Sequence, residues 1–341
     1  MKKITVSIII MSLLLICAYE ILSESQTIMN AVSYSFNIWM NNLFPSLFPF
    51  FVLSELLINY GLPELIGELF RPIFEKLFKI NGNTAFIFIM SLLSGFPSNA
   101  KYTRELLLQG KINDKEATKI LMFSHFSNPL FILGTISITF LNDKKLGIIV
   151  MISHYITNII IGILFRNYNP SNIKKSEFSI KKAILKMHDK RINNNKPIGS
   201  IITNSLTNSI NTLLLILGVV TTFLIITTII DNNFHLNLFS KTILSGFLEM
   251  TQGLKHASLL NTTSTYKAVL ITMILSFGGL SVHTQIISII SDTKIRYKPF
   301  LLARLIHTVI AGIICFLLIG IKWYITYIRI IWIKLIYNIN T

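Results

Sequence analysis

Long apolar runs separated by short polar stretches dominate the chain. A helix needs about 20 apolar residues to cross a bilayer. The runs that approach or exceed this length are residues 4–22, 43–60, 146–165, 198–230 and 299–321. The run at 43–60 contains Pro45 and Pro49, which bend a membrane helix where the freed carbonyls face protein or a cavity. The pattern predicts a bundle of membrane-spanning helices.

One further apolar run stops too early to cross a bilayer. Residues 86–101 read FIFIMSLLSGFPSNAK, and the apolar part ends in glycine, proline and polar residues. A similar run ends in the glycine-containing sequence LSFGGLS at residues 275–281. Paired interrupted segments in the two halves of a membrane protein point to a transport site. We therefore expect a re-entrant hairpin at residues 84–109 and its partner at residues 268–285.

Weaker patterns complete the predicted topology. Residues 62–80 and 238–255 mix apolar and charged residues, as interfacial amphipathic helices or solvent-facing loop helices do. Residues 117–141 cross the membrane with an interruption at Ser127-Asn128-Pro129. Counting the crossings makes the two halves inverted, so the sequence predicts an all-α polytopic membrane protein, an inverted-repeat bundle of about 7–8 transmembrane helices with two re-entrant or broken half-helix hairpins.

Charge and composition support this class and orient the chain. Half of the chain is hydrophobic (52%) and only 13% is charged, which excludes an ordinary soluble domain. The net charge of +16 lies mainly between apolar runs, above all in the linker 168–199, so it indicates cytoplasmic loops rather than nucleic-acid binding. The amino terminus is also expected in the cytoplasm. Cys17 and Cys315 lie in apolar runs without metal-type spacing, so no metal and no cofactor is predicted.

The predicted breaks supply the candidate binding residues. A half-helix that ends inside the protein leaves backbone N–H or C=O groups free, and these can bind a ligand beside hydroxyl and amide side chains. Such groups suit a polar, hydrogen-bonding solute such as a nucleoside, sugar or amino acid. The alternative for any single serine or glycine is close helix packing. The candidates are Ser94, Gly95, Ser98, Asn99, Ser127, Asn128, Ser276, Gly278, Gly279, Ser281, His283 and Gln285.

Ionisable residues in or beside apolar runs are a second class of candidates. A charge inside the membrane is costly, so it is a functional hypothesis by default. The candidates for coupling or substrate contact are Glu55, Glu249, Arg304 and His307, with His154 in a similar setting. Glu55 and Glu249 could equally lie at the membrane interface.

A catalytic motif is present in part. Ser98 and Lys101 satisfy the Ser-x-x-Lys pattern of penicillin-binding proteins, but the supporting Ser-Asp-Asn and Lys-Thr-Gly elements are absent. No phosphate-binding loop, Rossmann fingerprint or metalloprotease motif occurs. We therefore expect no enzymatic activity.

Four ordered motifs resemble one known family. LFPSLFPFFVLSELL at residues 43–57, SGFPSNAK at 94–101, SNPLFI at 127–132 and SFGGLSVH at 276–283 resemble the YlbJ-like sporulation integral membrane proteins. That family belongs to the nucleoside-recognition, or gate-domain, group, which is also found in concentrative nucleoside transporters and ferrous-iron transporters. The chain departs from the family at Phe96, where Tyr is common, and at Asn99, where a small residue is usual.

The resemblance implies a role in endospore formation, as a transporter or gate for a polar solute or lipid-linked precursor of the spore cortex. The alternative is a non-transporting membrane scaffold for cortex-building enzymes. Expected partners are membrane lipids, a small polar solute, and either a second copy of the chain or cortex-assembly proteins, but no nucleic acid. The cell membrane or the membranes around the forespore are the expected location.

The expected parts are an anchor helix (1–26), a first gate-like repeat (27–167), the basic linker (168–199), a second gate-like repeat (200–321) and an aromatic-basic interfacial tail (322–341).

Overall fold

Every regular element in the described residues is a helix. The structure is a computed structural model that describes residues 2–171, 179–194 and 196–339. In the first half the helices are α1 (Lys2–Ser23), α2 (Ser25–Ile38), η1 (Trp39–Leu43), α3 (Phe44–Asn59), α4 (Leu62–Ile73), η2 (Phe74–Phe78), α5 (Thr84–Ser94), α6 (Ser98–Leu108), α7 (Asp114–Phe123), η3 (Phe131–Phe140) and α8 (Lys144–Leu164). The prediction of an all-α protein is confirmed.

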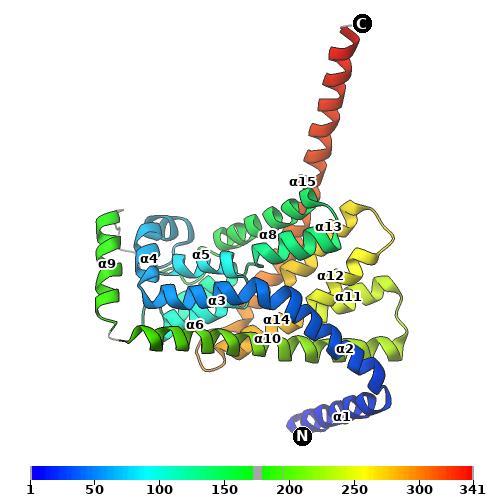
Figure 1. The fold of residues 1–341 in the computed structure, drawn as a ribbon, viewed down its shortest axis with the longest axis horizontal. Coiled ribbons are helices and arrows are strands. Elements are labelled where there is room, and N and C mark those ends of the chain that lie inside the picture. The colour runs from blue at the N-terminus through cyan, green and yellow to red at the C-terminus, as the bar shows by residue number, and fades with distance from the viewer. Residues whose placement is uncertain (1, 172–178, 195, 340–341) are drawn as a thin grey trace.

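The second half begins with the linker helix α9. The remaining helices are α9 (Ile180–Ile192), α10 (Ile198–Phe234), α11 (Leu238–Leu248), α12 (Met250–Leu259), α13 (Ser264–Phe277), α14 (Gly279–Ile290) and α15 (Tyr297–Ile339). The long helix α10 lies along α2 and α3, and the carboxyl-terminal part of α15 projects from the body (Figure 1). The predicted tail therefore continues α15 as one helix.

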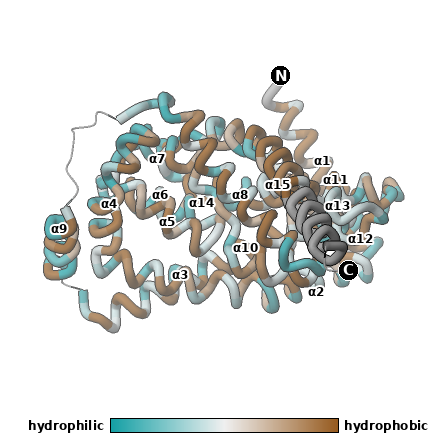
Figure 2. Tube along the Cα trace, turned by 90° about the horizontal axis from the view of Figure 1, so that it is seen from above, coloured by the Kyte–Doolittle hydropathy of each residue, from teal (hydrophilic) through white to brown (hydrophobic). Residues whose placement is uncertain are grey.

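Six helical stretches are long and apolar enough to cross a membrane, judged by length and composition over the described residues. They are Ile4–Ser23, Ser25–Asn59, Lys144–Leu164, Ile198–Phe234, Ser264–Ile290 and Tyr297–Ile321. Three shorter apolar helices, α5, η3 and α11, accompany them. Hydrophobic residues fill the middle of the body, and hydrophilic residues are prominent at α9 (Figure 2). The structure agrees with the predicted polytopic membrane protein.

A proline lies near each of the three wide-turn segments of the bundle. The π-helical segments η1, η2 and η3 lie next to Pro45, Pro72 and Pro129 respectively. Proline has no backbone N–H and its ring clashes with the carbonyl four residues earlier, so at Pro45 the carbonyl of Asn41, inside η1, cannot make its regular α-helical bond. The helix widens locally instead of ending.

The two halves repeat the same order of elements. Each contains a folded-back helix pair (α5–α6, α11–α12), a broken span (α7–η3, α13–α14) and a long final span (α8, α15). The sequence carries a trace of this repeat, because Ser94-Gly95-Phe96 recurs 151 positions later as Ser245-Gly246-Phe247. The first residues of α8 and α15, Lys144 and Tyr297, lie 153 positions apart.

This order corrects the predicted pairing of the breaks. The hairpin at residues 84–109 is present, since Phe86 on α5 contacts Tyr102 on α6 with ring centroids 5.6 Å apart. Its partner is α11–α12, whereas residues 268–285 lie in the broken span α13–α14, whose halves do not pack along each other. Residues 238–255 were expected as one amphipathic helix. They break at Glu249, a residue that gives no glycine or proline signal.

The linker helix α9 docks on α4 at one end of the molecule (Figure 1). The carboxylate of Glu68, whose side chain is 1% exposed, pairs with Lys186 at 2.7 Å and Lys182 at 3.1 Å from α9 and with Arg71 at 2.9 Å from its own helix. Three cations offset the cost of burying this acid. Two of the linker's lysines therefore fasten α9 to the bundle.

Candidate functional site

The four helix breaks meet in the centre of the molecule. In the first repeat the backbone N–H of Phe96, in the α5–α6 turn, donates to the carbonyl of Phe126, in the α7–η3 break, at 2.7 Å. Gly95 has φ 77°, and a Cβ there would lie 2.6 Å from the backbone nitrogen of Asn128. Only glycine therefore fits this turn, for both its backbone conformation and its close approach.

Asn128 holds the first-repeat breaks together. Its Oδ1 accepts from the backbone N–H groups of Leu130 at 2.7 Å and Phe131 at 3.3 Å, which are free donors at the start of η3. Its Nδ2 donates to the carbonyls of Ser46 at 3.2 Å and Leu93 at 3.0 Å. With its hydrogen-bonding groups used this way, Asn128 is a positioning residue between three elements.

The second-repeat breaks touch in an equivalent way. A Cβ on Gly279, before α14, would lie 3.0 Å from the backbone nitrogen of Met250 and 3.2 Å from the carbonyl oxygen of Leu248. Glu249, 1% exposed, accepts from the backbone N–H of Gln252 at 2.9 Å and from the hydroxyl of Thr251. It therefore caps the amino terminus of α12 with a buried carboxylate, where negative charge is favoured.

Histidines join the two repeats. The Nε2 atom of His154 accepts from the backbone N–H of Ser127 at 3.0 Å, so its Nδ1 carries the proton and donates to Ser276 Oγ at 3.1 Å. In α15, His307 Nε2 donates to the carbonyl of His154 at 3.1 Å, and the two rings are 5.0 Å apart. His154 and His307 lie 153 positions apart, at matching places in the repeats.

All of the predicted site residues are buried, and most of them lie at the breaks. His283 is held by Tyr297, whose hydroxyl is 2.8 Å from Nδ1, and by the carbonyl of Phe277 at 3.1 Å from Nε2. Ser98 bonds to Ser94 Oγ at 2.7 Å and to the carbonyl of Gly95. The buried set is Glu55, Ser94, Gly95, Ser98, Asn99, Ser127, Asn128, Glu249, Ser276, Gly278, Gly279, Ser281, His283, Gln285, Arg304 and His307. The four breaks bring them together, apart from Glu55, Gln285, Arg304 and His307, which lie within helices.

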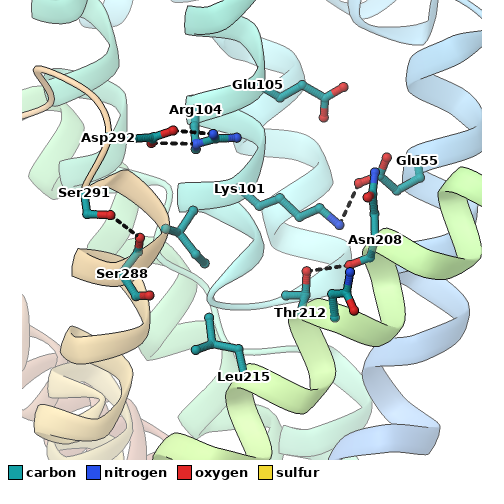
Figure 3. Close-up of a pocket in the computed structure, with 12 residues that line it drawn as sticks. Glu55, Lys101, Arg104, Glu105, Asn208, Thr212, Leu215, Ser288, Ser291 and Asp292 are labelled. Carbon is teal, nitrogen blue, oxygen red and sulfur yellow. Dashed lines mark hydrogen bonds and ion pairs between the residues drawn. The ribbon is translucent and has the colours of Figure 1, made fainter.

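An open polar cavity of about 610 Å³ lies along α6, the helix that follows the first break. Figure 3 shows its wall, formed by side chains from α3, α6, α10 and the end of α14. Lys101 Nζ lies 2.6 Å from Glu55 Oε1, and Arg104 pairs with Asp292 through both its Nε and Nη2 atoms. The remaining lining residues are Glu105, Asn208, Asn211, Thr212, Leu215, Ser288, Ile289 and Ser291.

A second cavity of about 550 Å³ continues from the first toward the linker. The two share Glu55, Glu105 and Asn208 as lining residues. The second is also lined by Lys190, Asn193, Asn194 and Lys196, and Asn194 Nδ2 donates to the carbonyl of Asn59 at 2.9 Å. The linker thus borders the outer part of the polar space.

Comparison with known proteins identifies the family. The "Sporulation integral membrane protein YlbJ" of Bacillus subtilis (strain 168) is 32% identical over 336 residues, which cover 92% of this chain and 82% of the relative. The chain belongs to the YlbJ family of sporulation integral membrane proteins. A family model described as nucleoside recognition, named Gate, matches residues 40–155, which run from η1 to α8 and so take in the first-repeat breaks. No solved structure matches the chain.

The polar cavity of this YlbJ family member was largely missed from sequence. Of its lining residues only Glu55 was a candidate. Two signals could have found five more of them. Lys101, Arg104 and Glu105 follow the first hairpin turn at helical spacing, and Asn208 and Asn211 continue a row of asparagines that starts at Asn204, at i, i+4 and i+7 on one helix face.

Burial changes the acidity of one cavity carboxyl in this YlbJ family member. Glu105 lies on α6, which is not one of the six candidate spans. Burial, together with the nearby charge of Glu55, raises the pKa of Glu105 to about 7. The charge of the cavity therefore changes near neutral pH.

Proposed function

We propose that this chain is a transporter or gate for a polar solute or lipid-linked precursor used in forming the spore cortex. The relative's name supports the link to sporulation. Two observations carry the transport proposal: four helix breaks meet, and an open polar cavity lies along α6, the helix that follows the first of these breaks. Interrupted helices from two repeats around one central site are the usual arrangement of secondary transporters.

The cavity suits a polar ligand with hydrogen-bonding groups. It offers two cations, Lys101 and Arg104, together with the amides of Asn208 and Asn211. Three acids pair with or face these cations, so the lining is polar without a strong excess of one sign. A ligand that carries both donors and acceptors could replace the exposed pair of Arg104 and Asp292, because the net contribution of an exposed ion pair is small, about 0–1 kcal/mol.

The proposed orientation follows from the linker. The basic segment 168–199 is proposed to be cytoplasmic by the positive-inside rule, and its residues Lys190 and Lys196 line the outer cavity. The cavity then opens toward the cytoplasm. The pair of Arg104 on α6 and Asp292 after α14 connects the two repeats across it and would have to separate for the repeats to move apart.

A non-enzymatic role is part of the proposal. In the Ser-x-x-Lys pattern, Ser98 Oγ is engaged with Ser94 and Gly95, while the amine of Lys101 pairs with Glu55. A serine–lysine pair for acyl transfer requires the two groups in mutual hydrogen-bond reach. The observed partners instead indicate that Ser98 stabilises the turn and that Lys101 is a cation in the cavity wall.

Filling the cavity tests the transport proposal. Asn208→Trp places a large side chain in the cavity wall, and Leu214→Trp, on the same helix at a position 51% exposed to the membrane, is the matched control. We expect Asn208→Trp, at normal membrane abundance, to accumulate the same cortex precursor as a deletion strain and to lack normal cortex. Leu214→Trp should behave as wild type. Normal cortex with Asn208→Trp would refute transport through this cavity and favour the scaffold.

A further inference from the structure

Arg304 is a buried cation without a counter-charge. The side chain lies on α15 and is 0% exposed. No ion pair joins Arg304 to an acid in the part of the chain that the structure describes. A charge removed from water without an opposite charge is strongly destabilising, so such a group needs a partner.

Two of the three guanidinium nitrogens lack a hydrogen-bond partner. Its Nη2 atom donates to the carbonyl of Met122, at the end of α7, and to Asn158 Oδ1 at 3.2 Å. The Nε and Nη1 atoms are buried and have no hydrogen-bond partner. Unmade bonds from a buried guanidinium are costly, so the N–H groups of Nε and Nη1, which point to different edges of the guanidinium, each need an acceptor.

A second set of free donors lies beside Arg304. His125 is 0% exposed, and neither of its ring nitrogens has a partner. Asn158 links the two residues, because its Nδ2 donates to the carbonyl of His125 at 2.9 Å while its Oδ1 accepts from Arg304. Phe300 lies against both, 5.2 Å from the His125 ring and 5.5 Å from the guanidinium carbon.

The start of α14 adds a positive helix end next to His125. A Cβ on Gly278 would be 3.3 Å from His125 Nε2, and α14 has no side-chain cap at its amino terminus. Uncapped N–H groups at a helix start favour negative charge. The guanidinium, the imidazole and the helix end therefore leave unused donors in one buried region.

We propose that a small anionic group binds between Arg304, His125 and the amino terminus of α14. The group is either a free inorganic anion or the carboxylate or phosphate of the transported solute. This site goes beyond the proposed function, because it states that the group bound where the helix breaks meet is negatively charged. Neither the cavity ion pairs nor the sporulation role requires it.

The test is anion-dependent thermal stability of the purified full-length chain in detergent. Sodium chloride, acetate and inorganic phosphate are compared with gluconate, a larger anion, at equal ionic strength. We expect a saturable rise in the unfolding midpoint, roughly 5 °C at 100 times the dissociation constant. A rise with chloride as well as oxyanions indicates a free anion, and a rise with acetate and phosphate alone indicates a solute's acid group.

Variants assign the response to the site. Arg304→Gln should abolish the rise and His125→Asn should weaken it, while Arg191→Gln, at an exposed position on α9, should keep it. His125→Asn leaves the buried charge in place, so it still tests the site if Arg304→Gln does not fold. An identical midpoint in all four salts, or a full response in His125→Asn and Arg304→Gln, would overturn the proposal. Because no solute is transported in this assay, its failure is distinct from failure of the Asn208→Trp test.

Discussion

The two hairpins both contain the sequence Ser-Gly-Phe near the end of their first helix but are built differently. In the first, Gly95 of Ser-Gly-Phe forms the turn itself with φ 77°. In the second, the matching Gly246 lies inside α11. A Cβ added to Gly253 of α12 would be 2.3 Å from the Cα atom of Gly246. One glycine is needed for a backbone turn and the other for helix contact, so a repeated motif does not imply a repeated role.

The groups that close the two hairpins differ in chemistry as well, because only one of them is ionisable. Neutral groups close the first, namely the Phe96–Phe126 backbone bond and the amide of Asn128. The buried carboxylate of Glu249 caps the second. A carboxyl group can take up or release a proton during transport and an amide cannot, so of the two closing groups only Glu249 could couple to protons.

The largest effect is expected where two backbones touch. Gly253→Ala forces its new Cβ against the backbone of Gly246, and the helices must separate at a cost of about 3 kcal/mol or more. We expect a lower unfolding midpoint and reduced abundance in membranes. Gly218→Ala on α10, where a Cβ meets nothing within 4 Å, is the control and should be neutral or slightly stabilising. Equal behaviour of both variants would contradict the close packing.

The next comparison sets the amide against the carboxylate. Asn128→Ala leaves buried backbone donors and acceptors without partners, each costing about 1–3 kcal/mol. Glu249→Gln keeps an oxygen that can accept from Gln252, so we expect a loss of about 1 kcal/mol or less. Thermal unfolding of the two purified variants measures this difference. A larger loss for Glu249→Gln would show that the charge itself stabilises the second hairpin.

A smaller effect is expected from pH at the cavity. The pKa of Glu105 rises from 4.5 to about 7 on folding, so the folded state holds this proton where the unfolded state has lost it. Stability should therefore fall as pH rises from about 4.5 to about 7 and then stay level. Glu105→Gln should flatten this part of the curve in unfolding measured at several pH values. An unchanged slope in Glu105→Gln would assign the dependence to another group.

Sequence patterns predicted the fold better than the contacts of the site. The breaks at Gly95 and Gly278 could be predicted because glycine and proline interrupt apolar helices. The break at Glu249 could not be predicted, because no glycine or proline marks it. There α11 ends and the side chain of Glu249 caps the start of α12. The pairing of Arg104 with Asp292, 188 positions apart, depends on how the repeats pack and leaves no local pattern.

The transport proposal requires that the polar cavity along α6 opens toward the cytoplasm. Asn208→Cys places one thiol in its wall after Cys17 and Cys315 are changed to Ser. A membrane-impermeant thiol reagent is applied to vesicles of each orientation, with Leu214→Cys as the membrane-facing control. The account predicts that Asn208→Cys is labelled from the cytoplasmic face and that Leu214→Cys is labelled from neither face. Labelling of Asn208→Cys only from the outer face, or from neither face, would contradict it.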